Sequence, residues 1–373
     1  MTTLTEQMTE PLLQTTVIDR RRNVTAWVVV DRLVNGRAMG GIRMTSDVNL
    51  AEVAQLARKM TLKLSLAELP IGGAKAGIVG TLPDGPARDD CLRAFGEAVA
   101  PLLHGGIYLG SDQGITYRDR DLICAAAGYD IQRTPAGAIL KCSWPELWRR
   151  CQNVTGHGVG EAAHMCANFL EVPIPRRVVI QGFGTVGRGV ATFLAAHGYT
   201  IVGVADQLGT LRLTEGGDVA HLIAATNAQG LIDRTALPPG VTVVSPKDAW
   251  LDLDADILVL AANSNAVSGK AAERIRSRIV VEGANFPCTP DALHVLQCNG
   301  ITVVPDIAAN CGGAAVTALV LTGRVPPLPD VESQVSWFFD EVRARVRRNV
   351  EKVLKQLAGG SAGSRQTPTN VGH

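Results

Sequence analysis

Residues 177–206 constrain the fold more than any other stretch, because an apolar segment, a glycine-rich turn and a second apolar segment follow directly on one another. Residues 177–181 are rich in β-branched side chains and predict a buried strand. The turn at residues 182–187 has the spacing Gly-x-Gly-x-x-Gly and opens a helix, and residues 200–205 predict a second strand that ends on an aspartate. This order predicts a dinucleotide-binding α/β unit.

Each glycine of this turn has its own role in such a unit. The first permits the tight turn, the second lets the pyrophosphate approach the backbone, and the third lets the helix pack on the strand. The helix N-terminus stabilises the phosphate charge. The aspartate accepts hydrogen bonds from the ribose hydroxyls and repels a 2′-phosphate, so we expect NAD rather than NADP. The residues predicted to bind the cofactor are Gly182, Gly184, Thr185, Val186, Gly187 and Asp206.

Three further apolar segments predict buried strands over residues 257–260, 278–281 and 301–304. Each is followed by a loop of small residues that contains an asparagine. The carboxyl ends of parallel strands line the cofactor crevice of a doubly wound sheet, although asparagine also tolerates turn backbone for its own reasons. Three such loops in succession favour a functional set, which consists of Asn265, Asn285 and Asn310.

The composition narrows the class of protein. A chain of 373 residues with 46% hydrophobic residues and 39 glycines is typical of an α/β protein with two domains. A net charge of +1 gives no indication of nucleic-acid binding. The eight cysteines contain no Cys-x-x-Cys pair, which argues against a zinc site and favours a reducing compartment. There is no signal peptide and no long apolar run, so we expect a cytoplasmic protein without a membrane segment.

A second group of residues indicates acid–base chemistry in the first half of the chain. Lys75 lies in the run of small residues 72–77, which we expect to be a loop, and Lys63 ends a predicted helix over residues 47–66 with Asn49 as its N-cap. Two ammonium groups near one pocket repel, so that one can lose its proton near neutral pH and act as a base. The alternatives are a solvated loop lysine at 75 and a lysine at 63 whose charge snorkels to water.

Asp112 follows a short predicted strand that begins at Gly106. Carboxylates at strand ends are common catalytic groups in α/β folds, but Asp112 could instead form an Asx-turn or cap the predicted helix over residues 119–128. His157, between two glycines, could be a ligand, an acid or a plain loop histidine. The remaining expectations are strands over 25–31 and 37–44, helices over 84–103, 155–170 and 330–358, a loose arm over 1–15, and a connector over 141–153.

Taken together, these motifs resemble the glutamate/leucine/phenylalanine/valine dehydrogenase superfamily, and their wording is most similar to the glutamate dehydrogenase branch. Eight motifs occur in the family's order between about residue 25 and residue 325. They are Gly40-Gly-Ile-Arg43, Met60-Thr-Leu-Lys63, Gly72-Gly-Ala-Lys75, Ser111-Asp112, Thr155-Gly-His-Gly-Val159, Gln181-Gly-Phe-Gly184, Val281-Glu-Gly-Ala-Asn285 and Asn310-Cys-Gly-Gly313.

The resemblance implies an α/β fold with two domains and an active site in the cleft between them. An N-terminal substrate and oligomerisation domain over residues 1–150 would precede a doubly wound, Rossmann-type NAD-binding domain over residues 151–325. A C-terminal helix over 326–358 would pack back on the first domain, and residues 359–373 would form a disordered tail. The family also implies a homo-oligomer.

The implied activity is reversible oxidative deamination of an L-amino acid to a 2-oxo acid and ammonia, with hydride transfer to the nicotinamide. By motif, Lys75 would be the base that activates water and Asp112 the proton shuttle at the amine. Lys63 would bind the substrate carboxylate, assisted by the backbone of Gly40 and Gly41. The resemblance further implies cofactor contacts from Thr155, Asn265 and Asn285, and a substrate pocket bordered by Asn310 and Thr317.

One departure from the family bears on the substrate. In glutamate dehydrogenases a further lysine binds the substrate's side-chain carboxylate, and we assign its position to Ala54, nine residues before Lys63. Losing that charged partner would forfeit about 1.5–3 kcal/mol, so we expect a neutral, apolar amino acid. The alternatives are a glutamate dehydrogenase that uses Arg43, Arg149 or Arg150 instead, and a catalytically idle paralogue that binds NAD.

Overall fold

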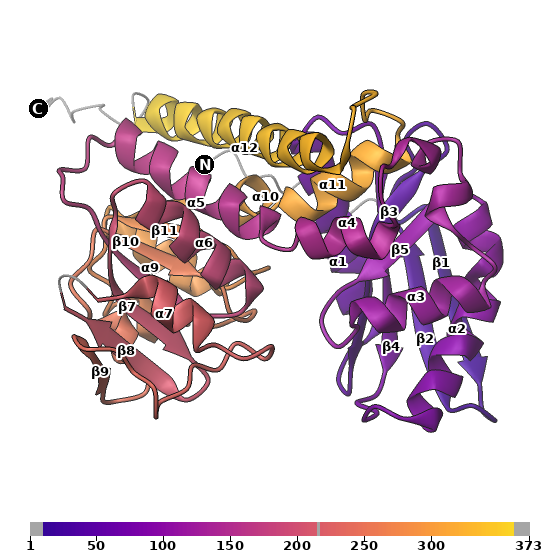
Figure 1. The fold of residues 1–373 in the computed structure, drawn as a ribbon, viewed down its shortest axis with the longest axis horizontal. Coiled ribbons are helices and arrows are strands. Elements are labelled where there is room, and N and C mark those ends of the chain that lie inside the picture. Colours follow the sequence, from indigo (N-terminus) through magenta and orange to yellow (C-terminus); the bar gives the residue numbers. More distant parts are fainter. Residues whose placement is uncertain (1–9, 215–216, 362–373) are drawn as a thin grey trace, which may run out of the picture. The chain divides into compact units, whose positions relative to one another are not determined.

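The computed structural model describes residues 10–214 and 217–361. The chain divides into two compact units (Figure 1). One unit, the nucleotide unit, comprises Gln152–Gly312 and the chain from Phe339 on. The other, the lysine unit, comprises the described residues from 10 to 151 together with Gly313–Phe338. No helix within the described ranges is long and apolar enough to span a membrane.

The lysine unit is built on a five-stranded sheet in the order β1-β2-β4-β3-β5. Strand β1 is antiparallel to β2 and β2 to β4, whereas β3 runs parallel to both β4 and β5. The elements are β1 (Leu13–Asp19), β2 (Val24–Val30), β3 (Ala38–Thr45), α1 (Leu50–Leu66), β4 (Gly72–Val79), α2 (Pro86–His104), β5 (Ile107–Ser111), α3 (Tyr117–Ala126) and α4 (Trp144–Arg150). The unit also contains two short 3₁₀ turns (Ile131–Arg133 and Gly137–Ile139) and most of helix α11 (Gly312–Leu321).

The alternation of side chains along β4 divides this sheet into two different faces. Ala74, Ala76 and Ile78 point into a hydrophobic core that also contains Phe95 of α2. On the opposite face a Cβ added at Gly73 would lie 2.3 Å from the backbone nitrogen of Thr61, so the backbone of α1 lies directly on this strand. Lys75 therefore belongs to the face that α1 covers.

The nucleotide unit contains a seven-stranded sheet in the order β12-β11-β10-β6-β7-β8-β9. Strands β12 to β7 of this order are parallel, and β8 and β9 continue the sheet antiparallel. The strands are β6 (Arg177–Gln181), β7 (Thr200–Asp206), β8 (Gly209–Leu213), β9 (Val241–Val244), β10 (Ile257–Leu260), β11 (Ile279–Glu282) and β12 (Thr302–Val304). The helices are α5 (Val154–Phe169), α6 (Thr185–Ala196), α7 (Val219–Ala224), α8 (Gly269–Ala272), α9 (Pro290–Cys298), α10 (Asp306–Ala309) and α12 (Val331–Ser361), the last of which begins in the lysine unit.

This topology confirms the expected doubly wound α/β fold. The chain passes from β6 to β7 on one side and to β10, β11 and β12 on the other, so the strand order reverses at β6. Ligands of such sheets bind at the carboxyl ends of the strands beside the reversal. The glycine-rich turn follows β6 directly, and the fold thus brings the predicted phosphate-binding turn to this point.

Two local expectations are wrong. Lys75 lies within strand β4 and not in a loop, because its glycine and alanine neighbours allow close packing of strand and helix and do not form a turn. Residues 13–15, expected in a loose arm, pair with β2 as part of β1. The expected connector over 141–153 does contain the boundary between the two units, after Cys151, and it also contains helix α4, which is capped by Ser143. The predicted N-cap at Asn49 is confirmed, since its side chain accepts a hydrogen bond from the backbone of Glu52.

Candidate functional site

A buried cluster of opposite charges surrounds Lys75. Its ammonium Nζ lies 2.8 Å from Oδ2 of Asp112, the residue directly after β5. Nε of Arg43, on β3, lies 3.3 Å from the same oxygen. Arg43 also donates from Nη1 to Oε1 of Glu52 on α1 at 2.5 Å. Two cations therefore face a single carboxylate oxygen, and Glu52 balances part of their charge.

Glycine at position 41 keeps the space in front of this pair open. A Cβ added at Gly41 would lie 2.8 Å from Cβ of Asp112 and 3.4 Å from Nζ of Lys75. Gly40 has a different reason to be glycine, because a Cβ there would lie 1.6 Å from the carbonyl oxygen of Ala74 on β4. Both predicted substrate-binding glycines thus lie on β3, where Gly40 packs against β4 and Gly41 borders the Lys75–Asp112 pair.

The electrostatics of the cluster fix the charge of Asp112. Burial alone would raise the pKa of this carboxyl, but Lys75 and Arg43 outweigh the burial and lower its pKa from 3.8 to about 2. Asp112 is therefore an anion near neutral pH, and its charge favours a contact with a neighbouring ammonium group. It is not a helix cap, since α3 is capped by Thr116 in a capping box with Asp119.

The other two residues predicted to bind the substrate, Lys63 and Thr317, are both buried. Lys63 lies in the last turn of α1 and is only 6% exposed, which excludes a fully solvated side chain. Thr317 is buried in α11, and its hydroxyl donates to the carbonyl oxygen of Gly313 at 3.2 Å. The hydroxyl of Thr317 is therefore engaged by its own helix in this structure.

Helix α1 contradicts the argument from Ala54. Nine residues correspond to two and a half turns of an α-helix, which puts Ala54 on the opposite side of α1 from Lys63 and about 13–14 Å away along the axis. Ala54 packs instead against a small apolar cluster that contains Val29, Val48 and Val53. An alanine at this position therefore says nothing about a side-chain pocket near Lys63.

The turn after β6 has the form that the phosphate-binding role requires. Gly182 has φ +93°, and a Cβ added there would lie 2.5 Å from the backbone nitrogen of Ala262. A Cβ at Gly187 would lie 1.9 Å from the carbonyl oxygen of Gly182, whereas one at Gly184 meets no described atom within 4 Å. Helix α6 begins at Thr185, so its free N–H groups and the open side of Gly184 fit a pyrophosphate.

Asp206 does not present a free carboxylate to a ribose. Its side chain is 1% exposed and forms two hydrogen bonds with the guanidinium of Arg234, at 2.6 Å and 2.9 Å. The backbone nitrogens of Leu208 and Ile232 each donate to it at 2.8 Å. Four donors fill the acceptor positions of the carboxylate, and the expected hydrogen bonds to ribose hydroxyls find no vacant position in this structure.

The three asparagines come together as the strand order predicts. Nδ2 of Asn310 donates to the carbonyl oxygen of Gly283 at 3.1 Å and to Oδ1 of Asn285 at 3.3 Å. The backbone nitrogen of Asn265 donates to the carbonyl oxygen of Phe286, beside Asn285, at 2.7 Å. Oδ1 of Asn310 is buried without a hydrogen-bond donor among the described residues, which suits an acceptor reserved for a ligand.

Two acids that the sequence analysis missed hold the loop of Asn285. Oε2 of Glu282 accepts from the backbone nitrogen of Asp306 at 3.2 Å, and Oδ2 of Asp306 accepts from that of Phe286 at 2.8 Å. Glu282 is the last residue of β11, and Asp306 begins α10 two residues after β12, so a position just after a predicted strand was the available sequence signal. Thr155, expected at the cofactor, lies at the start of α5, where its Cα would be 2.7 Å from a Cβ at Gly312.

His157 is a packing residue. Its ring lies edge-on to Phe339 and Phe193, with centroid distances of 4.9 Å and 5.8 Å. Burial lowers the pKa of this histidine, so it is neutral near pH 7. Across residues 10–214 and 217–361 no group of three or more histidine, cysteine or acidic side chains could hold a metal ion.

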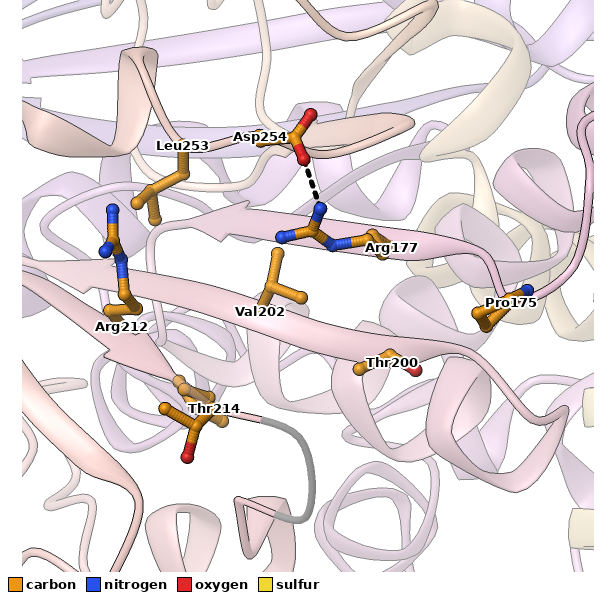
Figure 2. Close-up of a pocket in the computed structure, with 9 residues that line it drawn as sticks. Pro175, Arg177, Thr200, Val202, Arg212, Thr214, Leu253 and Asp254 are labelled. Carbon is orange, nitrogen blue, oxygen red and sulfur yellow. Dashed lines mark hydrogen bonds and ion pairs between the residues drawn. The ribbon is translucent and has the colours of Figure 1, made fainter.

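A hollow of about 470 Å³ lies away from these residues. It opens where Arg177 and Thr200 begin β6 and β7, and Arg177 is paired there with Asp254 (Figure 2). Dinucleotides bind at the carboxyl ends of parallel strands, whereas this hollow lies at the amino-terminal ends. It is therefore separate from the predicted cofactor site.

Two protein-family models and several curated proteins match this sequence. The sequence model described as Glutamate/Leucine/Phenylalanine/Valine dehydrogenase matches residues 149–367, and that of the Glu/Leu/Phe/Val dehydrogenase dimerisation domain matches residues 12–122. The glutamate dehydrogenase of Thermotoga maritima is 32% identical over 89% of this chain and 77% of its own length. An NADP(+)-dependent glutamate dehydrogenase of Pyrobaculum calidifontis is 33% identical over 86% of this chain and 75% of its own.

A solved structure agrees with these matches. The hetero-hexameric glutamate dehydrogenase from Thermus thermophilus, in its Leu-bound form, superposes with a TM-score of 0.77 at 28% identity, and the match covers 94% of this chain and 85% of that one. The fold, the order of the motifs and the sequence matches all agree. This chain belongs to the glutamate/leucine/phenylalanine/valine dehydrogenase family of amino-acid dehydrogenases.

Proposed function

We propose that this chain catalyses the reversible oxidative deamination of an L-amino acid to the 2-oxo acid and ammonia with NAD or NADP. The observation that carries the proposal is the buried contact of 2.8 Å between Nζ of Lys75 and Oδ2 of Asp112 beside Gly41. A lysine and a carboxylate in contact can exchange a proton, and each can exchange one with substrate or water.

The roles of the two groups follow from the balance of the reaction. Amino acid, water and oxidised cofactor give 2-oxo acid, ammonium, reduced cofactor and a proton, and the bound nicotinamide would accept the hydride from the substrate's Cα. Lys75, once deprotonated, takes a proton from the water that attacks the imine carbon. Asp112 takes a proton from the substrate ammonium group and returns one to the leaving amine. Lys63 holds the α-carboxylate.

Glutamate is the substrate that the comparisons favour. The relatives and the solved structure reported above are all glutamate dehydrogenases, and the argument for an apolar substrate from Ala54 fails on the geometry of α1. The alternative weighed in the sequence analysis therefore has better support than the neutral amino acid. We take glutamate as the first substrate to test.

A neutral amino acid remains a second candidate because of the arginines. Arg43 is paired with Glu52 and Asp112, and Arg149 with Glu146. Arg150 is paired with Glu146 and with Glu332. Each arginine that could replace a side-chain lysine is thus already matched by a carboxylate, which weakens its attraction for the side chain of glutamate.

The test is a panel of glutamate, leucine, valine, phenylalanine and tryptophan, each with NAD and with NADP, followed by the absorbance of the reduced cofactor. We expect one amino acid to give turnover well above the others. A catalytically idle paralogue would give no turnover with any of the ten combinations of amino acid and cofactor. That outcome would overturn the proposed activity, although the intact Lys75–Asp112 pair argues against it.

Both NAD and NADP are candidates for the cofactor. Named relatives include both an NADP-dependent and an NAD-specific glutamate dehydrogenase, and Asp206 no longer supports a preference for NAD. We propose that the nucleotide unit binds the cofactor and that the lysine unit binds the substrate and forms a homo-oligomer. A cytoplasmic location is also proposed, supported by eight cysteines that form no disulfide.

A further inference from the structure

Arg234 joins three segments of the nucleotide unit at the end of β7. Its Nη1 donates to Oδ2 of Asp206 at 2.9 Å and to the carbonyl oxygen of Ile232 at 3.0 Å. Its Nη2 donates to Oδ1 of Asp206 at 2.6 Å and to the carbonyl oxygen of Gly209 at 3.3 Å. The planar guanidinium thus meets the carboxylate with two parallel hydrogen bonds, the geometry in which such pairs are strongest.

The segment that carries Arg234 also lies against the glycine-rich turn. A Cβ added at Gly230 would lie 2.9 Å from Cα and 3.0 Å from the backbone nitrogen of Gly184. The guanidinium of Arg188, on α6, donates to the carbonyl oxygens of Thr226 and Asn227, at 3.3 Å each. Both predicted contacts of the nucleotide, the second glycine of the turn and the acid that ends β7, therefore touch one segment, residues 226–234.

The charge at this position differs from the charge that the motif implies. A free carboxylate at the end of the second strand repels a 2′-phosphate, and a nearby arginine accommodates one. Here the side chain of Asp206 is 1% exposed and its negative charge is paired with the guanidinium of Arg234, whose own side chain is 20% exposed. A dinucleotide seated on the turn would meet a position that is neutral overall and whose more accessible side chain is the cation.

We propose that Arg234 selects the cofactor in this chain: by pairing with Asp206 it removes the repulsion of a 2′-phosphate, so that NADP(H) is accepted as well as NAD(H). The inference deepens the proposed function and depends on it only for the binding of a dinucleotide. It can therefore be tested by binding alone, in the absence of any amino acid.

The experiment measures the Kd of NADH and of NADPH for the full-length protein by isothermal titration calorimetry. For the wild type we expect two Kd values within about tenfold of each other. In Arg234→Met the carboxylate of Asp206 is left uncompensated, and we expect the ratio of Kd(NADPH) to Kd(NADH) to rise by at least about tenfold. Arg212→Met removes an exposed arginine of β8 and should leave the ratio unchanged.

Two further variants separate charge from folding. Arg234→Lys keeps the cation and should retain most of the NADPH affinity that Arg234→Met loses. Asp206→Asn keeps the shape of the side chain but frees the charge of Arg234, and should tighten NADPH relative to NADH. Because this variant predicts a gain in affinity, a general loss of structure cannot imitate it.

The outcomes are distinct. A wild type that binds NADPH more than about a hundredfold more weakly than NADH, or an unchanged ratio in Arg234→Met and Asp206→Asn, overturns the role of Arg234. Failure to bind either cofactor overturns both this inference and the proposed function. Binding of both without turnover on any amino acid overturns the proposed function and leaves the selection by Arg234 supported.

Discussion

Asp112 and Asp206 lie at equivalent positions at the ends of strands, but their carboxylates differ in how exposed they are. Each lies at the carboxyl end of a strand, β5 or β7, and each is paired with an arginine. The side chain of Asp112 is 18% exposed, whereas that of Asp206 is 1% exposed. The two cations beside Asp112 both face Oδ2, while Arg234 engages both oxygens of Asp206.

The difference follows from how the two arginines use their donors. Arg43 directs Nη1 to Glu52 and only Nε to Asp112, so this arginine engages one oxygen of the carboxylate, and the side chain of Asp112 keeps 18% of its surface exposed. Arg234 donates from both Nη1 and Nη2 to the two oxygens of Asp206. A carboxylate at a strand end is therefore a better candidate for chemistry when its arginine engages one oxygen and leaves the side chain partly exposed.

The largest expected effect is on turnover in Asp112→Asn. An amide cannot shuttle a proton, so we expect kcat to fall by about 10²–10⁴-fold while the fold is retained. The matched control is Asp90→Asn on α2, where the aspartate pairs with Arg93 at the surface. Steady-state kinetics with the best substrate of the panel measures both, and equal kcat values in the two variants would remove Asp112 from the mechanism.

The next effect is on stability and concerns the other aspartate. Arg234→Met leaves a buried carboxylate without its cation, which destabilises proteins by about 3–5 kcal/mol. Arg43→Met should be milder, because Asp112 keeps its contact of 2.8 Å with Lys75. Urea unfolding of both variants gives the comparison, and a larger loss in Arg43→Met would reverse our ranking of the two pairs.

A third prediction concerns pH. The pKa of Asp112 is lowered from 3.8 to about 2, so its ionised form stabilises the folded state above pH 4 by about 2 kcal/mol. This contribution is lost as the pH falls from about 4 to about 2. The difference in free energy of unfolding between wild type and Asp112→Asn should therefore shrink across that range, and a constant difference would contradict the lowered pKa.

The smallest effect is expected from Glu52→Gln. Removing this carboxylate makes the surroundings of Lys75 more positive, so the acid limb of the kcat/KM profile should move to lower pH by roughly a few tenths of a unit. The shift should vanish in the Arg43→Met background if Glu52 acts through Arg43. Glu97→Gln, at the surface beside Arg22, serves as the control, and a shift of equal size in that variant would deny Glu52 a specific role.

Much of the fold could be predicted because its signals are local. The turn at residues 182–187, the strands that follow and the N-cap at Asn49 depend on neighbours within a few residues, and the structure confirms them. Lys75 was misplaced because its alanine and glycine neighbours are rare in strands. The glycines of β4 serve close packing against α1, a tertiary cause that no local pattern reveals.

The site was only partly predictable for the same reason. Lys75 and Asp112 belong to motifs, and the structure brings them into contact. The partner of Asp206 is 28 residues away in a segment without a motif, so sequence spacing could not show that the carboxylate is occupied. The Ala54 argument failed because it counted residues without considering which side of the helix they face.

The most direct test of the account is amino-acid-dependent reduction of NAD or NADP by the wild type and by Lys75→Ala, with folding checked by circular dichroism. Without its base the variant should lose at least about a hundredfold in kcat with the best substrate, while its Kd for the reduced cofactor stays near that of the wild type. Unchanged turnover in Lys75→Ala would contradict the assignment of this chemistry to the Lys75–Asp112 pair.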